Sequence, residues 1–333
     1  MRRFSFLVLT LGLSLGATAA AAGETLTVYT YDSFTSEWGP GPAIETAFES
    51  QCGCDLEWVT VDDAALLLSR LRLEGDNTDA DVVLGLDTNL MAEAETTGLL
   101  QPHGIDMAGL DLPVAWDDPV FVPFDYGYFA IVYDSEVLPE PPASLAELVE
   151  NGDGPKLIIQ DPRTSTPGLG LLLWMQDVYG DDAAAAWTKL NERVLTVTKG
   201  WSEAYGLFLD GEAPMVLSYT TSPAYHQIVE ETDRYRAAVF AEGNYLQVEL
   251  AAMTAGTDNR DLAREFLAFV LTRDFQETIP TGNWMYPVID LGDDLPQAFR
   301  DLPKPPRALL IDSGDVAAHR SAWIDAWLGA MTQ

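Results

Sequence analysis

Short strand-like runs alternate with helix-like segments in the chain beyond residue 25. A strand, helix, strand, helix, strand order is typical of a parallel α/β sheet, because the helices carry the chain back along the sheet. Asp62 and Asp63 precede the second helix, whose positive N-terminal end favours carboxylates as caps. The predicted strands and helices, in chain order, are residues 26–31, 42–50, 56–61, 64–73 and 81–86.

Two long β-rich runs, residues 121–134 and 245–253, frame the middle of the chain. We expect each run to pass between two lobes, so that the chain leaves the first lobe near Tyr126 and returns to it near Val248. Two crossings form a hinge, and the cleft between hinged lobes is a usual place for a ligand. The expected lobes are residues 23–125 together with 248–333, and residues 126–247.

Further short elements are predicted in the second lobe and after it. Ser144 follows a Pro-rich turn and is suited to cap a helix. The remaining elements are strands at residues 156–160 and 215–219, and helices at residues 169–179, 183–193, 262–271 and after Ser321.

Residues 1–22 have the pattern of a secretory signal peptide. Arg2 and Arg3 supply the positive start, residues 4–15 supply the apolar stretch, and small residues allow cleavage between Ala19 and Ala22. The apolar part is too short to span a bilayer comfortably, and no later stretch is long and apolar enough to do so. We therefore expect an exported protein that is cleaved from its signal and is not embedded in a membrane.

Charge and composition narrow the function classes. The chain of 333 residues has a formal net charge of −34, which becomes −36 without Arg2 and Arg3. Nucleic-acid binding is not expected, because it needs a basic patch and the sequence shows none. An acidic surface favours solubility and attracts cationic ligands. Without the signal, about 310 residues remain, which is more than one core usually organises and favours two lobes.

Cys52 and Cys54 flank Gly53. An oxidising compartment permits a disulfide between them, although the ring would be small, and two free thiols are an equally open interpretation. A zinc site is not expected, because no second pair of Cys or His has ligand spacing.

Three passages place aromatic residues beside Gly, Pro, Ser or Thr, outside any regular apolar repeat. In such loop-like surroundings they can gather on a concave surface and enclose a flat, cationic molecule, because the face of an aromatic ring carries negative charge density. Each residue alone is equally consistent with core or turn packing, so the interpretation depends on the set. The passages are TKGWSEAYG (198–206), SYTTSPAYH (218–226) and IPTGNWMYP (279–287), which contain Trp201, Tyr219, Tyr225, Trp284 and Tyr286.

The passage DPRTSTPGLG, residues 161–170, contains a helix-start signal. Ser165 and Thr166 suit the N-cap, and Pro167 suits the first helical position. Backbone N–H groups and hydroxyls at such a start bind phosphate or another anion, although capping alone explains these residues equally well. The Gly-Lys-Ser/Thr ending of a nucleotide-binding P-loop is missing.

Neither the acidic residues nor the known catalytic motifs indicate an enzyme. Asp63, Asp87 and Asp125 each lie near a predicted strand end, where a carboxylate can offset a ligand cation but can also cap a turn or face solvent. The sequence has no G-x-S-x-G elbow and no H-E-x-x-H pair. Carboxylate pairs are too abundant in this chain to indicate glycoside chemistry. We expect no catalytic residues and no metal site.

Longer strings of the sequence resemble the periplasmic thiamine-binding proteins of bacterial ABC importers. The resemblance covers most of the chain after the signal and keeps order and spacing. The chain departs from the family in two respects: its surface is more acidic, and the segment after Pro287 matches less well. The strings are TVYTYDSF (27–34), WGPGP (38–42), ADVVLGLD (80–87), FVPFDYGYF (121–129), QDPRTSTPGLGLLLWMQ (160–176), VTKGWSEAYGLFL (197–209), LSYTTSPAYH (217–226) and IPTGNWMYPV (279–288).

The resemblance implies a two-lobed α/β periplasmic-binding-protein fold of type II, with two crossovers between the lobes. Such a protein closes over thiamine, thiamine monophosphate or thiamine diphosphate in the periplasm and delivers it to a membrane permease. It is not an enzyme and uses no cofactor.

The resemblance also implies which side chains form the site. Trp201, Tyr225 and Trp284 would be aromatic walls for the pyrimidine and thiazolium rings. Tyr31 and Tyr219 would add ring edges and hydroxyls.

The polar part of the implied site lies at the starts of two predicted helices. Asp63 and the backbone of Ala64 would face the polar end of the ligand. Ser165 and Thr166 would hold the hydroxyethyl group or its phosphate. The polar rim would be completed by Thr220, Thr221 and Ser222.

Other interpretations stay open. Aromatic residues with carboxylates also suit a polyamine, and paired tyrosines suit Fe(III). A thiamine-degrading enzyme on a related two-lobed fold would need a nucleophilic cysteine in the cleft. Cys52 and Cys54 precede the second predicted strand, and a disulfide would disable both.

Overall fold

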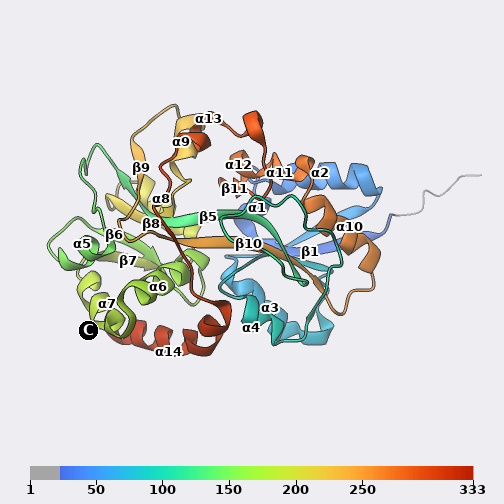
Figure 1. The fold of residues 1–333 in the computed structure, drawn as a ribbon, viewed down its shortest axis with the longest axis horizontal. Coiled ribbons are helices and arrows are strands. Elements are labelled where there is room, and N and C mark those ends of the chain that lie inside the picture. The colour runs from blue at the N-terminus through green and yellow to red at the C-terminus, as the bar shows by residue number, and fades with distance from the viewer. Residues whose placement is uncertain (1–22, 333) are drawn as a thin grey trace, which may run out of the picture.

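The structure of the protein is a computed structural model that describes residues 23–332. The expected signal peptide, residues 1–22, lies outside the described residues. Two halves lie side by side and are joined by long strands through the middle of the molecule (Figure 1). Within residues 23–332, no helix is both long and apolar enough to cross a membrane.

A parallel core opens the first half, as the sequence predicts. Strand β1 (Thr25–Tyr31) pairs in parallel with β2 (Asp55–Val61) and with β3 (Val82–Asp87). The short β4 (Leu100–Gln101) pairs with a later strand. The helices of this half are α1 (Asp32–Thr35), α2 (Gly41–Cys52), α3 (Ala65–Glu74), α4 (Met91–Glu95), α10 (Arg260–Val270), α11 (Arg273–Gln276) and α12 (Ile279–Gly282).

Two long strands connect the halves. Strands β5 (Phe121–Asp134) and β10 (Asn244–Thr254) pair antiparallel to each other, and β10 also runs antiparallel to β3. Every residue of β10 is buried, which is expected of a strand covered on both faces. The predicted crossings are therefore confirmed, but the expected parallel sheet is mixed. Its strand order is β2-β1-β3-β10-β5-β8-β6-β7.

The second half repeats the strand and helix alternation. Strand β6 (Leu157–Gln160) pairs in parallel with β7 (Val194–Thr198) and β8 (Met215–Tyr219), and β9 (Tyr235–Ala238) pairs with β5. The predicted cap at Ser144 is confirmed, since its Oγ accepts a hydrogen bond from the Glu147 N–H at 3.0 Å. The helices are α5 (Leu145–Glu150), α6 (Thr166–Tyr179), α7 (Ala183–Asn191), α8 (Trp201–Leu209) and α9 (Pro223–Val229).

The C-terminal helix α14 (Ser313–Met331) lies against both halves. It packs on α6 and α7 and also on α4 (Figure 1). The sequence predicts this helix only after Ser321, whereas it begins at Ser313, because the Asp312 carboxylate accepts from the Gly314 N–H at 2.9 Å and caps the first turn. The other late elements are β11 (Tyr286–Pro287), β12 (Ala308–Leu309), α13 (Gln297–Arg300) and 3-10 turns at Gly75–Asn77, Gly180–Asp182 and Gly292–Asp294.

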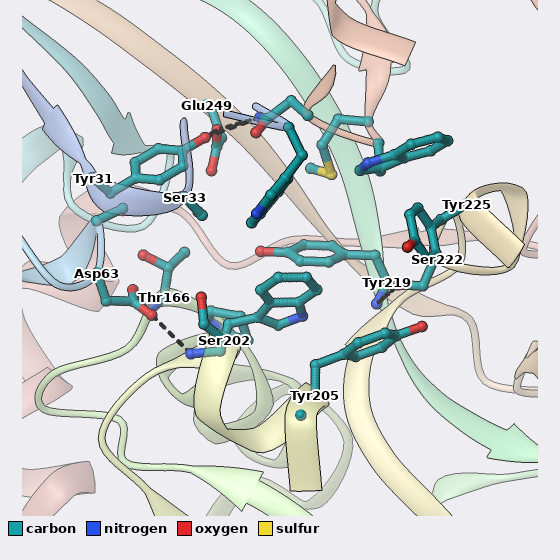
Figure 2. A pocket seen from close by; sticks show the side chains of 18 of the residues that line it. Tyr31, Ser33, Asp63, Thr166, Ser202, Tyr205, Tyr219, Ser222, Tyr225 and Glu249 are labelled. Carbon is teal, nitrogen blue, oxygen red and sulfur yellow. Dashed lines mark hydrogen bonds between the residues drawn. The ribbon is translucent and has the colours of Figure 1, made fainter. Parts of the chain in front are cut away.

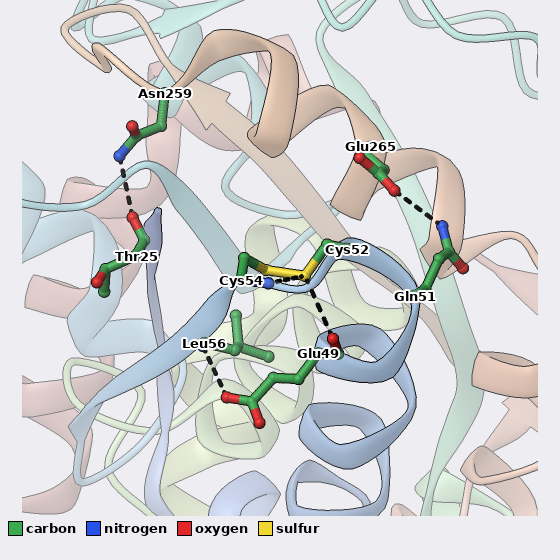
Figure 3. Close-up of a disulfide and its surroundings, with 8 residues drawn as sticks. All are labelled: Thr25, Glu49, Gln51, Cys52, Cys54, Leu56, Asn259 and Glu265. Carbon is green, nitrogen blue, oxygen red and sulfur yellow. Dashed lines mark hydrogen bonds between the residues drawn. A yellow bond between two sulfur atoms is a disulfide. The ribbon is translucent and has the colours of Figure 1, made fainter. Parts of the chain in front are cut away.

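The two cysteines of the chain lie where α2 ends and β2 begins, and the structure decides between a disulfide and two free thiols. Cys52 and Cys54 form a disulfide in the turn that joins the two elements (Figure 3). Beside it, the Glu49 carboxylate accepts a hydrogen bond from the Leu56 N–H at 3.0 Å. Within residues 23–332, no cluster of His, Cys, Asp and Glu could hold a metal ion.

Candidate functional site

A cavity of about 400 Å³ lies between the two halves. Its size is within the range of pockets that hold small molecules. Figure 2 shows Tyr31 and Asp63 on one side of it and Tyr205 and Tyr225 on the other. Nine of the twelve residues expected from the sequence line it, namely Tyr31, Asp63, Ala64, Thr166, Trp201, Tyr219, Ser222, Tyr225 and Trp284.

Trp201 forms a wall of the cavity, and its contacts hold the indole in one position. The indole stacks on Tyr205 with ring centres 5.0 Å apart and planes at 22°. Its Nε1 donates a hydrogen bond to Ser218 Oγ at 2.8 Å, and the Tyr205 hydroxyl pairs with His226 Nε2 at 2.8 Å. Because the ring face and the ring N–H are both engaged, Trp201 is ordered in advance for stacking against a ligand.

Trp284 and Tyr225 meet edge to face, with ring centres 5.1 Å apart and planes at 87°. Trp284 has a φ of 57°, a left-handed conformation that costs a residue with a side chain about 1–2 kcal/mol. Its N–H donates to the Ile279 carbonyl at 3.1 Å, which holds the backbone there. Strain of this kind concentrates at ligand-binding sites, so it supports a functional role for the Trp284 ring.

Trp201 and Tyr225 lie in helices, so the expectation of loop-like surroundings is wrong for these two residues. Trp201 follows Gly200 as the first residue of α8, and Tyr225 lies in α9, which begins at Pro223. Proline favours a first helical turn, because the N–H that it lacks would be unpaired there. Trp284 does lie outside helices and strands, between α12 and β11. The two walls from the second half are thus mounted on rigid elements.

Tyr31 and Tyr219 reach the cavity from β1 and β8. Tyr31 donates a hydrogen bond to Glu249 Oε2 at 2.7 Å, and Tyr219 donates to Gln247 Oε1 at 2.9 Å. Burial and nearby carboxylates raise the pKa of both hydroxyls above the usual range, so both stay protonated donors. Gly85, with a φ of 118°, makes room for Tyr31, because a Cβ there would lie 2.7 Å from the tyrosine ring.

Asp63 connects the two halves across the cleft. Its Oδ1 accepts from the Thr166 N–H at 2.9 Å and its Oδ2 from the Trp201 N–H at 3.2 Å (Figure 2). One carboxylate of the first half therefore sits at the positive N-terminal ends of α6 and α8 in the second half. Burial raises the pKa of Asp63 to about 6, opposed by these two hydrogen bonds.

The expectation that Asp62 and Asp63 cap the helix that follows them is wrong. Helix α3 has Ala64 at its N-cap, with no side-chain hydrogen bond to the first turn. Asp62 instead forms an exposed ion pair with Lys199 at 2.7 Å, which also crosses the cleft. Both carboxylates thus face the second half.

Three residues expected in the site do not line the cavity. Ser165 is the N-cap residue of α6, as predicted, but it is fully buried and its hydroxyl makes no capping hydrogen bond. Thr220 and Thr221 are fully buried in the turn between β8 and α9. In the described structure these three residues lie behind the cavity surface.

The charged residues that line the cavity are acidic. They are Asp62, Asp63 and Glu249, and no Lys, Arg or His of the described chain is among the lining residues. Asp87 is buried but accepts from the N–H groups of Asn89 and Leu90, so it caps a turn, one of the alternatives that the sequence left open. This charge distribution favours a cation over an anion or a neutral ligand.

Comparison with known proteins agrees with this geometry. Residues 35–277 match the family model of bacterial extracellular solute-binding proteins. The chain belongs to this family. The thiamine-binding periplasmic protein of Brucella suis biovar 1 (strain 1330) is 56% identical over 334 residues, which cover 100% of both chains. The resemblance that the sequence strings indicate is confirmed.

Solved structures show the fold of this solute-binding protein. A periplasmic thiamin binding protein superposes with a TM-score of 0.91 at 56% identity, covering 93% of this chain and 97% of that one. Iron-bound HitA from Pseudomonas aeruginosa has a TM-score of 0.74 at 19% identity, covering 91% and 99%, and shows the fold alone. The two-lobed type II fold is therefore confirmed. The chain is a solute-binding component of an ABC importer, a carrier and not an enzyme.

Several lining residues of this solute-binding protein were missed from the sequence. Glu249 matters most, and a signal for it exists, because it is the one charged residue of the buried strand β10. It follows Gln247 by two positions, so both side chains lie on the same face of β10. The missed residues are Ser33, Trp38, Asp62, Pro167, Ser202, Tyr205, Gly206, Leu209, Glu249, Asn283 and Met285.

Proposed function

We propose that this solute-binding protein captures thiamine in the periplasm, after removal of residues 1–22, and delivers it to the permease of an ABC importer. The observation that supports this most is the cleft itself, where Trp201, Tyr225 and Trp284 surround a cavity whose charged lining residues, in the part of the chain that the structure describes, are all acidic. Thiamine is a flat monocation with a pyrimidine and a thiazolium ring. Each contact between such a cation and an aromatic face contributes about 0.5–2 kcal/mol.

In the proposed pose, the aromatic residues contact the rings of thiamine and the polar residues contact its hydroxyethyl group. Trp201, Tyr225 and Trp284 enclose the two rings, and Tyr31 and Tyr219 contribute ring edges and hydroxyls. The hydroxyethyl group points towards the place where α3 and α6 begin. Its polar neighbours there are Asp63, Ala64, Thr166 and the buried Ser165, and Ser222 lies on the rim, backed by Thr220 and Thr221.

Thiamine monophosphate and diphosphate are part of the proposal. The start of α6 is the natural place for a phosphate, because helix N-termini bind anions. The Asp63 carboxylate accepts from the Thr166 N–H there, so a phosphate would displace that carboxylate or meet it in its protonated form. Since burial raises the pKa of Asp63 to about 6, protonation is within reach near neutral pH.

Closure of the lobes over the ligand is the proposed transport step. An open form would break the hydrogen bonds from Thr166 and Trp201 to Asp63 and the ion pair between Asp62 and Lys199. Thiamine would shift the equilibrium towards the closed form by as much as it binds that form more tightly. The expected lobes, residues 23–125 with 248–333 and residues 126–247, stay a proposal.

Isothermal titration of ligand-free protein tests the function. The protein is unfolded, dialysed and refolded to remove any bound solute, and then titrated with thiamine. We expect saturable 1:1 binding and a higher midpoint of thermal unfolding, because a ligand that binds only the folded state stabilises it. Absence of both effects would overturn the proposal.

Parallel titrations separate the alternatives. Binding of spermidine or Fe(III) without binding of thiamine would point to another cationic solute. Release of free thiazole on incubation with thiamine would point to a thiamine-degrading enzyme, although Cys52 and Cys54 are joined to each other and do not line the cavity.

A further inference from the structure

Two buried carboxyl groups face each other where the crossing strands meet. Asp125 of β5 and Glu249 of β10 are opposite each other in the antiparallel register. Asp125 has no exposed surface, and Glu249 is 5% exposed. Asn283 Nδ2 donates to Asp125 Oδ2 at 2.6 Å and lies 3.4 Å from Glu249 Oε2. The two carboxyl groups thus share one amide group between them.

This pair lacks a compensating positive charge. Asp125 Oδ1 has no hydrogen-bond partner among the described residues. Burial raises the pKa of Asp125 to about 8, and burial together with the Asp125 charge raises the pKa of Glu249 well above its usual range. Among residues 23–332, none of the titratable groups that face the pair is basic. They are Tyr31 from β1, Asp87 from β3, Tyr219 from β8 and Asp63 before α3.

Only Glu249 of the two reaches the cavity. Its Oε2 accepts from the Tyr31 hydroxyl at 2.7 Å, and its Oε1 accepts from Gln247 Nε2 at 2.7 Å. Figure 2 shows the Glu249 carboxyl beside the Tyr31 hydroxyl at one end of the cavity. Asp125 lies behind it and makes no contact with the cavity. The geometry therefore divides the pair into a group at the cavity surface and a buried partner.

We propose that Glu249 recognises the positive charge of the solute, and that the pair it forms with Asp125 holds one proton, which is released when a cation binds. The O–H bond of the protonated carboxyl breaks, the proton leaves to solvent, and the ligand cation takes over the neutralisation of the second carboxylate. This inference rests on the proposed function for the identity of the cation, thiamine. Beyond that function, it assigns the selection for positive charge to Glu249 and predicts that the affinity depends on pH.

Proton release is measured directly by titrating thiamine at pH 7 in phosphate and in Tris, buffers whose ionisation enthalpies differ. The difference in apparent heat divided by the difference in ionisation enthalpy gives the protons released. We expect about 0.5–1 proton per thiamine. Because binding releases protons, the affinity must also rise with pH between about pH 6.5 and 8. The neutral thiophene isostere of thiamine should release none.

Two substitutions separate the roles within the pair. In Asp125→Asn, Glu249 carries its charge before the ligand arrives, so proton release should disappear and thiamine affinity at pH 7 should rise. In Glu249→Gln, affinity should fall by at least about tenfold, because the carboxylate at the cavity surface is gone. Glu203→Gln is the matched control, since Glu203 is exposed on α8 and does not line the cavity.

A measurement without thiamine keeps this inference separate from the proposed function. Infrared difference spectra between unchanged protein and Asp125→Asn at pH 7 should show the C=O band of a protonated carboxyl group in the unchanged protein only. If that band is absent, or if thiamine binds without proton release, the inference is overturned and the function stands. If the band is present and thiamine does not bind, the proposed function is overturned, and the pair remains a site for a different cation.

Discussion

Replacing Asp125 by asparagine should stabilise the ligand-free protein, and the gain should grow with pH. Asp125 is fully buried, and burial raises its pKa from 3.8 to about 8. A raised pKa means that the folded chain holds a proton that the unfolded chain gives up above about pH 4. Folding therefore becomes less favourable as pH rises from about 4 to about 8, and the loss levels off above that range.

The size of the effect follows from the shift. Each pH unit between the unfolded and folded pKa costs about 1.4 kcal/mol, so the cost of a single group grows by about 4 kcal/mol between pH 5 and pH 8. Sharing of the proton with Glu249 spreads the titration and lowers this figure. Asparagine keeps an oxygen that can accept from Asn283 and carries no charge. We expect Asp125→Asn to gain about 2–4 kcal/mol more stability at pH 8 than at pH 5.

Urea unfolding at pH 5 and pH 8 measures this difference, with thiamine removed from every sample. The control is Asp117→Asn, which makes the same change of charge at an exposed position and should show no comparable dependence on pH. Equal changes in unfolding free energy at the two pH values would refute the assignment of a proton to the pair. If the stability gained by Asp125→Asn over the unchanged protein is smaller at pH 8 than at pH 5, the assignment is refuted as well.

Other substitutions test other parts of the cleft. Trp284→Ala should weaken thiamine binding by about 1–3 kcal/mol in a titration, through lost burial and ring contact, whereas Trp284→Phe should keep most of the affinity. Asp63→Asn should raise the affinity for thiamine monophosphate relative to thiamine, because a charge beside the Thr166 N–H is removed; an unchanged ratio would place the phosphate elsewhere. Gly85→Ala should lower both the unfolding midpoint and thiamine affinity, because its Cβ collides with the Tyr31 ring; full affinity would mean that Tyr31 is not in the site.

Much of the fold follows from local patterns. The β-rich run 121–134 coincides with strand β5 (Phe121–Asp134), because a strand buried along its length reads as a continuous apolar and aromatic run. Helices α8 and α9 were missed, since each is short and flanked by Gly or Pro, which are also loop signals. The start of α14 was placed too late for a related reason. Its first turn, after Asp312, contains Gly and Asp and little apolar periodicity.

The site was predictable where residue type alone carries the signal, and not where distant segments meet. Large aromatic residues in polar surroundings singled out Trp201, Tyr219, Tyr225, Trp284 and Tyr286, and all of them except Tyr286 line one cavity. Asp63 was expected to cap its own helix, since local capping is the commoner role. Its partner Thr166 is 103 positions away in the chain, and the sequence pattern of neither segment predicts that the two residues meet.

The carboxyl pair of Asp125 and Glu249 could not be predicted either, because its two members come from distant segments. Asp125 and Glu249 are charged residues inside two buried, largely apolar strands, which is visible in the sequence, but only the antiparallel register places one opposite the other. Once they are opposite, two buried acids with no base nearby must share a proton or meet a cation. Because β5 and β10 are also the strands that join the halves, we infer that the charge of the solute is recognised at the hinge. A neutral analogue that fills the aromatic walls would leave that proton in place and lack this contribution to binding.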